Sequence, residues 1–89
     1  MKTLEDFLLD LKGKGFQFGE DAVGFIYFGK QYTGSTDELT IIAIELTLKS
    51  QKKFDGSFYI SLLEMFPANN IKTRKQAIRY VKQKQLLPI

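Results

Sequence analysis

The sequence predicts a single small α+β domain, and three observations lead to that prediction. An amphipathic helical pattern opens the chain, β-branched and aromatic residues fill its middle, and a second helical pattern follows residue 72. With 89 residues the chain has room for one core, so residues 1–89 are expected to form one domain. The expected order is α-β-β-β-α, a three-stranded antiparallel meander with the N- and C-terminal helices packed on one face.

The first helix is predicted by an apolar stripe that begins just after Thr3. Apolar residues recur at the helical spacing i, i+3, i+4 and i+7: Leu4, Phe7, Leu8 and Leu11. Thr3 can cap the first turn, with Asp6 three residues further on, and Gly13 supplies the end of the helix.

Three strands are expected between residues 23 and 66. Residues 23–33 are β-branched and aromatic, and residues 39–49 alternate between apolar and polar side chains. Residues 34–38 (GSTDE) form the turn between them. Asp55-Gly56 is a preferred dipeptide of the type I′ hairpin, so it is expected to lead into a third strand at residues 57–66.

Pairing outward from the Asp55-Gly56 turn gives the third strand two different faces. Tyr59, Leu63 and Met65 would face the core. Two short helices cover only one side of such a sheet, so apolar side chains on the other side form a candidate interface for self-association or for a partner protein. The predicted interface residues are Phe58, Ile60, Leu62, Phe25 and Tyr27. A β-bulge that shifts the register would instead bury Phe58, Ile60 and Leu62, and this alternative stays open.

The last helix follows a break at residues 67–70 (PANN). Thr73 and Gln76 have the spacing of a capping box at its start. Its end is expected by Leu87, before Pro88.

Charge is distributed unevenly along the chain. Residues 1–64 hold seven basic and ten acidic side chains, a net charge of −3, whereas residues 65–89 hold six basic and no acidic ones, a net charge of +6. This asymmetry favours a polyanionic partner. The alternative is a terminal helix that is rich in lysine for solubility alone.

The start of the last helix carries the clearest functional indication. Lys72 and Arg74 stand at its amino end, where the helix dipole is already positive, so these cations oppose the dipole unless an anion is present. Lys75, Arg79 and Lys82 follow on one stripe of the helix. These five residues are therefore the predicted nucleic-acid-binding set, with contacts to phosphates rather than bases.

The order of elements and the sequence Thr-Arg-Lys-Gln-Ala at residues 73–77 resemble the double-stranded-RNA-binding domain, whose last helix opens with a Ser-Lys-Lys-x-Ala-Lys motif. The resemblance implies that Arg74 and Lys75 reach phosphates across a groove. The third basic position of the motif is Ile78 here, and the Pro-His loop of that family has no counterpart. The opening is also similar to the Thr-Lys-Lys-Glu-Ala of arm-binding domains in phage integrases. Neither likeness assigns the chain to a family.

Nothing in the sequence indicates catalysis, a cofactor or a metal site. The chain has no His and no Cys, which removes the commonest general base and the commonest metal ligands. The acidic pairs at residues 5–6, 20–21 and 37–38 are adjacent in sequence, and adjacent side chains do not converge on one substrate atom. The glycine-rich residues 13–24 lack the spacing of a phosphate-binding loop. We therefore expect a protein that is not an enzyme.

Two functions follow from these observations. The first is a nucleic-acid-binding module that uses the basic C-terminal helix. The alternative is a protein-binding or self-assembling module, an inhibitor or accessory protein of the phage or mobile-element type, that uses the apolar sheet face. The expected partners are the phosphate backbone of a nucleic acid or an acidic protein, together with further copies of the chain as a homo-oligomer.

The sequence also predicts a cytoplasmic protein with no membrane partner. Its apolar runs are far shorter than the ~20 residues of a membrane-spanning helix. Glu5, Asp6 and Asp10 interrupt the N-terminal segment, which therefore lacks the pattern of a signal peptide. The absence of cysteine fits a reducing compartment.

Overall fold

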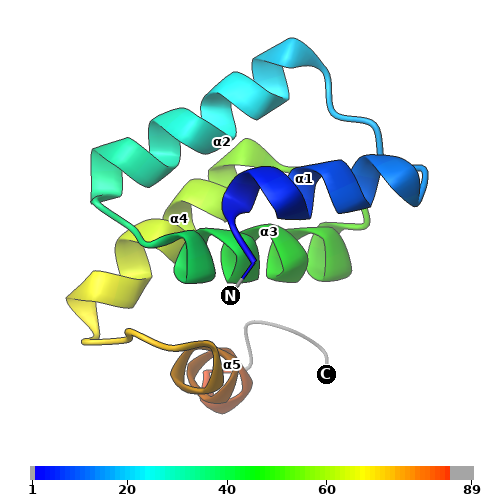
Figure 1. Cartoon of the computed structure of the whole chain (residues 1–89). Helices are drawn as coiled ribbons and strands as arrows, with labels where there is room; N and C mark the ends of the chain where they lie inside the picture. Colours follow the sequence, from blue (N-terminus) through cyan, green and yellow to red (C-terminus); the bar gives the residue numbers. More distant parts are fainter. Residues whose placement is uncertain (1, 85–89) are drawn as a thin grey trace.

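A computed structural model describes residues 2–84 and consists of helices joined by short connections (Figure 1). Within these residues there is no strand, so the predicted α+β class and its three-stranded meander are wrong. The helices are α1 (Leu4–Gly13), α2 (Glu20–Thr33), α3 (Asp37–Gln51), α4 (Gly56–Ala68) and α5 (Arg74–Gln83). The resemblance to the double-stranded-RNA-binding domain loses its topological part with this result.

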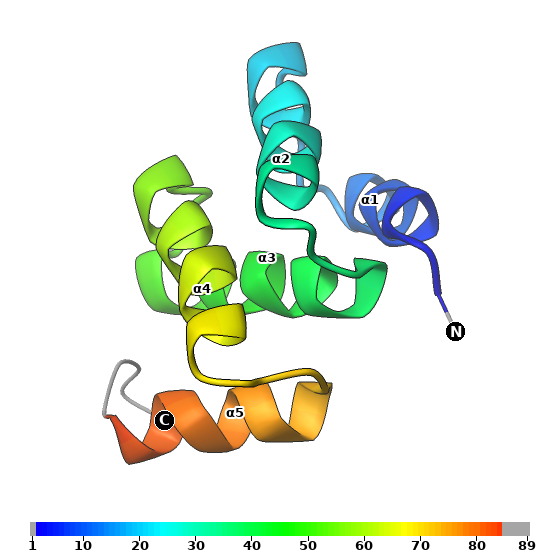
Figure 2. The same cartoon turned by 90° about the vertical axis from the view of Figure 1, so that its left-hand side faces the viewer.

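Helix α3 lies at the centre of the fold and packs against α1, α2, α4 and α5 (Figures 1 and 2). Its buried residues cover about 200° of its circumference at 100° per residue, and they are Leu39, Thr40, Ile42, Ala43, Ile44, Leu46 and Thr47. A helix buried over so wide an arc shows no narrow apolar stripe. The alternation of Ile42, Ile44 and Leu46 was therefore mistaken for the period of a strand.

Two threonines are buried in α3, and both hydroxyls are satisfied within the helix. Thr40 Oγ1 donates to the carbonyl oxygen of Thr36 at 2.8 Å, and Thr47 Oγ1 donates to that of Ala43 at 2.6 Å. Because each hydroxyl bonds to a carbonyl one turn back, burial leaves neither of them unpaired. The β-branched threonines that favoured a strand in the sequence are thus accommodated in a core helix.

Helices α2 and α4 contain the residues predicted as the first and third strands, and they pack closely at Gly29. A Cβ atom at Gly29 would lie 2.9 Å from both Ile60 Cδ1 and Tyr59 Cε2, so a side chain there would collide with α4. Tyr59 is fully buried, and its hydroxyl donates to the carbonyl oxygen of Ile26 at 2.6 Å. Phe25 and Tyr59, which fell in predicted strands, therefore pack α2 against α4.

Side-chain caps fix where four of the described helices begin. Thr3, Thr36, Asp55 and Thr73 each accept a hydrogen bond from the backbone N–H three residues further on. The predicted caps at Thr3 and Thr73 are confirmed, including the capping box with Gln76, and α1 ends at Gly13 as predicted. The predicted end of the last helix by Leu87 lies outside the described residues.

The predicted type I′ hairpin at Asp55-Gly56 is wrong. Asp55 Oδ1 accepts the N–H of Phe58 at 3.1 Å, and Gly56 is the first residue of α4. An aspartate suits both a helix N-cap and a tight turn, so the dipeptide alone does not distinguish them. The connection from α2 to α3 is the short segment 34–36, in which Gly34 adopts the left-handed conformation with φ of 65°.

Candidate functional site

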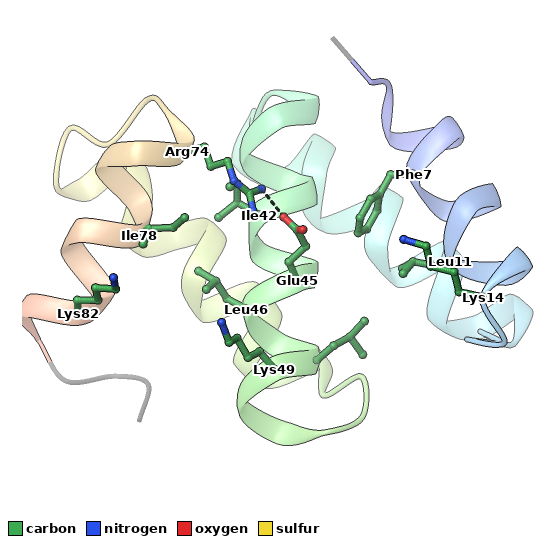
Figure 3. A pocket seen from close by; sticks show the side chains of 11 residues that line it. Phe7, Leu11, Lys14, Ile42, Glu45, Leu46, Lys49, Arg74, Ile78 and Lys82 are labelled. Carbon is green, nitrogen blue, oxygen red and sulfur yellow. Dashed lines mark hydrogen bonds and ion pairs between the residues drawn. The ribbon is translucent and has the colours of Figure 1, made fainter. Parts of the chain in front are cut away.

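Helices α1, α3 and α5 enclose a groove of about 480 Å³, which we call the basic groove (Figure 3). Residues of α3 line its centre, and residues of α1 and α5 line its two sides. The apolar lining consists of Phe7, Leu11, Ile42, Leu46, Leu48 and Ile78, and the charged lining consists of Lys14, Glu45, Lys49, Arg74 and Lys82.

The basic groove has a surplus of positive charge. Its one lining carboxylate, Glu45, pairs with the guanidinium of Arg74. Lys14, Lys49 and Lys82 form no ion pair within residues 2–84. Three ammonium groups therefore line an apolar surface without being held in an ion pair by any carboxylate of residues 2–84.

These three lysines mark the carboxyl ends of three helices. Lys14 is the C-cap of α1, and Lys49 and Lys82 lie in the last turns of α3 and α5. Cations at these positions stabilise the negative ends of the helix dipoles, which gives each lysine a structural role even without a ligand. Because the three ends meet at one groove, the same arrangement also concentrates positive charge there.

The five basic residues predicted to bind phosphate are divided between two surfaces. Arg74 and Lys82 line the basic groove. Lys72, Lys75 and Arg79 are exposed and do not line it. The structure thus separates residues that the helical spacing had placed together, and nucleic-acid binding by them stays a prediction.

The anion expected at the start of α5 comes from within the chain. Glu38 Oε2 accepts the backbone N–H of Arg74 at 2.8 Å, and Glu45 pairs with its side chain. These carboxylates of α3 offset the positive amino end of α5 and the cation placed there. They lie 36 and 29 residues before Arg74, so the local sequence of α5 held no signal for them.

The five residues predicted as an apolar interface do not share one face. Leu62 is buried in the core, and Phe58 and Ile60 are half-buried against it. Phe25 packs beside Tyr59, and of the five only Tyr27 is among the exposed large apolar side chains of residues 2–84. A helix turns successive residues by 100°, so a face inferred from strand alternation is distributed around α4.

A second groove, of about 450 Å³, lies between α1, the connection after it and α2. Its apolar lining consists of Leu8, Leu9, Phe16, Phe18, Val23 and Tyr27. The exposed large apolar residues Leu9, Phe16, Phe28 and Tyr32 were not predicted as a surface. The high density of aromatic residues between 25 and 32 was the available signal, but it was interpreted as a strand.

The acidic pairs have structural roles at helix starts. They stand in the first turns of α1, α2 and α3, where carboxylates are favoured by the helix dipole. Asp37 also accepts the backbone N–H of Leu4 at 3.0 Å and pairs with Lys30 at 3.4 Å, so it fixes the start of α1 on α3. Within residues 2–84 no group of three or more acidic side chains is placed to hold a metal ion.

In the part of the chain that the structure describes, no helix has the length and apolar content needed to cross a membrane.

A protein-family model with the description "Family of unknown function (DUF6123)" matches residues 1–87. No curated protein and no solved structure matches the chain.

Proposed function

The chain belongs to the DUF6123 family, whose function is unknown, and from its surfaces we propose a non-enzymatic module that binds an acidic segment of a partner protein in the basic groove. The observation that carries this proposal is a set of three lysines around one apolar groove, Lys14, Lys49 and Lys82, which form no ion pair in the part of the chain that the structure describes. We further propose that the protein acts in the cytoplasm, as its lack of cysteine led us to expect.

The groove combines two kinds of recognition. Leu48 and Ile78 are only partly buried, so they offer apolar contacts to an incoming side chain. The ammonium groups stand on α1, α3 and α5, so carboxylates on a bound segment can be neutralised from several directions. An amphipathic helix with an apolar stripe and acidic flanks matches both features. A phosphate backbone would use the charges and leave the apolar contacts unused.

Nucleic-acid binding through α5 is the second candidate function. It is supported by Lys72, Lys75 and Arg79, which are exposed and form no ion pair within residues 2–84. Such binding would weaken with salt, with a log–log slope of about −0.9 per neutralised phosphate on duplex DNA.

Charge reversals on the two surfaces distinguish the candidates. The double variant Lys14→Glu/Lys49→Glu alters the groove, and the matched variant Lys75→Glu/Arg79→Glu alters α5 outside it by the same charge. The probes are a helical peptide with Leu at i, i+3, i+4 and i+7 and Glu elsewhere, a scrambled peptide of equal charge, and duplex DNA. Affinity would be measured by fluorescence anisotropy over a range of salt concentrations.

For groove binding we expect the amphipathic peptide to bind more tightly than the scrambled one. The groove variant should lose most of that affinity, while the α5 variant should keep it. Circular dichroism checks that both variants remain helical. Equal binding of the two peptides, or an equal loss in both variants, would contradict groove binding. DNA binding that only the α5 variant loses would support the second candidate instead.

A further inference from the structure

Helix α2 lies at the opposite end of the molecule from α5 (Figures 1 and 2) and carries a set of exposed large apolar side chains. Tyr27, Phe28 and Tyr32 are 37%, 57% and 67% exposed. The second groove adjoins them through Tyr27 and adds Leu9 and Phe16, which are 61% and 45% exposed. We call these five residues the α2 aromatic face.

The face has a ridge on one side and a groove on the other. Phe28 and Tyr32 form the ridge, with their rings stacked at 5.6 Å between centroids and 16° between planes. Leu9, Phe16 and Tyr27 line the groove of about 450 Å³. At 100° per residue, Gly24 lies between the directions of Tyr27 and Phe28, so it stands between ridge and groove.

Gly24 leaves open space beside α2 that no other described residue fills. It is exposed in the interior of α2, and an added Cβ atom would meet nothing within 4 Å. Glycine is unfavourable in a helix interior, so such a position needs a reason. Gly29 of the same helix has one, because Tyr59 and Ile60 pack on it. At Gly24 no packing contact within residues 2–84 supplies such a reason.

We propose that a second copy of the chain packs on the α2 aromatic face, around a two-fold axis that passes near Gly24. A symmetric interface uses the same surface on both copies, so it must be self-complementary. A ridge and a groove on opposite sides of one glycine meet this requirement, because the ridge of each copy can enter the groove of the other.

The available area and charge agree with a pair of identical chains. At ~200 Å² for a large side chain, the exposed parts of the face amount to roughly 500 Å² per copy. A symmetric pair would bury about 1,000 Å², the lower limit for a specific interface. The charged side chains that line the groove, Glu5 and Lys12, balance each other, so no excess charge opposes the meeting of two copies.

Sedimentation equilibrium of the full chain tests the proposal. We expect a reversible dimer with a Kd on the order of micromolar, given the modest area. Gly24→Gln places a side chain at the point of closest approach, and Phe28→Ser removes part of the ridge. Each should raise the Kd at least ~10-fold. Lys75→Gln is the control, since Lys75 is also exposed and helical but lies on α5, at the opposite end of the molecule from α2.

Thermal unfolding separates assembly from folding. Gly24→Gln should leave the dilute chain at least as stable as wild type, because glutamine favours a helix more than glycine does. A wild-type chain that stays monomeric up to millimolar concentration would overturn the proposal. So would a dimer whose Kd is the same in Gly24→Gln and Phe28→Ser as in wild type, since that dimer must use another surface.

Discussion

The hydroxyl of Tyr59 links α4 to α2 inside the core. Burial raises the pKa of this hydroxyl above its ordinary value of 10.0, because the phenolate would lose its hydration. The folded chain therefore keeps the proton at pH values where the unfolded chain releases it. The contribution of Tyr59 to stability is complete below pH 10.0 and is lost as the pH rises above that value.

Replacing Tyr59 by Phe tests this residue in two ways. At neutral pH the loss of the hydrogen bond to Ile26 should lower the free energy of unfolding by about 1 kcal/mol. Above pH 10.0 the variant should lose stability less steeply than wild type, because phenylalanine has no proton to release. Urea denaturation at several pH values measures both effects. Parallel pH profiles for the two proteins would contradict the role given to the hydroxyl.

Lys52 ends α3 in a backbone conformation that favours glycine. Its φ of 63° is left-handed, nearly the same as the 65° of Gly34 at the end of α2. Lys52→Gly should therefore raise the free energy of unfolding by up to ~1 kcal/mol. Lys52→Ala is the control, because it removes the same charge and keeps the strain. Urea denaturation measures the free energy of unfolding of both variants. If it rises equally in both, the loss of the charge and not the relief of strain is the cause.

At the scale of elements, replacing either of two glycines of α2 by alanine should change the free energy of unfolding in opposite directions. Gly29→Ala forces a methyl group against Ile60 and Tyr59 and should lower the free energy of unfolding by about 1–3 kcal/mol. Gly24→Ala meets no atom within 4 Å and should raise it by up to ~1 kcal/mol in the dilute chain. Thermal unfolding at low concentration measures both. The same sign for the two variants would mean that α2 does not meet α4 at Gly29.

How well each element could be predicted depended on how it is buried. Helices α1 and α5 bury one narrow stripe each, so the period of Leu4, Phe7 and Leu11 and the box of Thr73 and Gln76 identified them. For the three middle helices the sequence predicted strands, and that prediction is wrong. In α3 the apolar residues surround more than half of the helix, which hides the helical period.

Signals for the middle helices were nonetheless present in the sequence. Gly34 is followed by Thr36 and two acidic residues, which is the pattern of one helix ending and another beginning. The prediction of a turn between strands used the same residues. A capping threonine followed by acidic residues favours a helix start whether the helix is buried on one side or on several, which β-branched content does not.

The candidate site was less predictable than the fold, because its parts come from distant segments. The basic residues of α5 were visible as a cluster, but their division between two surfaces depends on how α5 packs against α3. The pairing of Arg74 with Glu45 spans 29 residues and follows from tertiary structure alone. A helical projection of α5 could not show which cations remain unpaired.

At the scale of the whole molecule, the central position of α3 determines how the fold opens. Because α3 packs against every other described helix, its amides should exchange with solvent only when the whole chain unfolds. Helices α1 and α5 lie on opposite sides of α3 (Figure 1). We therefore expect each of them to open locally without the other. Hydrogen exchange should therefore show slow amides in α3 and faster ones in α1 and α5.

Helices α1 and α5 form the two walls of the basic groove. We therefore expect these walls to open locally more often than α3, which forms its centre. A ligand that bridges α1 and α5 would suppress the local opening of both helices. The conformational entropy lost in this way would oppose its binding. Protection gained on binding should appear first in the outer helices and leave α3 unchanged. Exchange followed by mass spectrometry would thus report occupancy of the groove even for a ligand that leaves the average structure as it is.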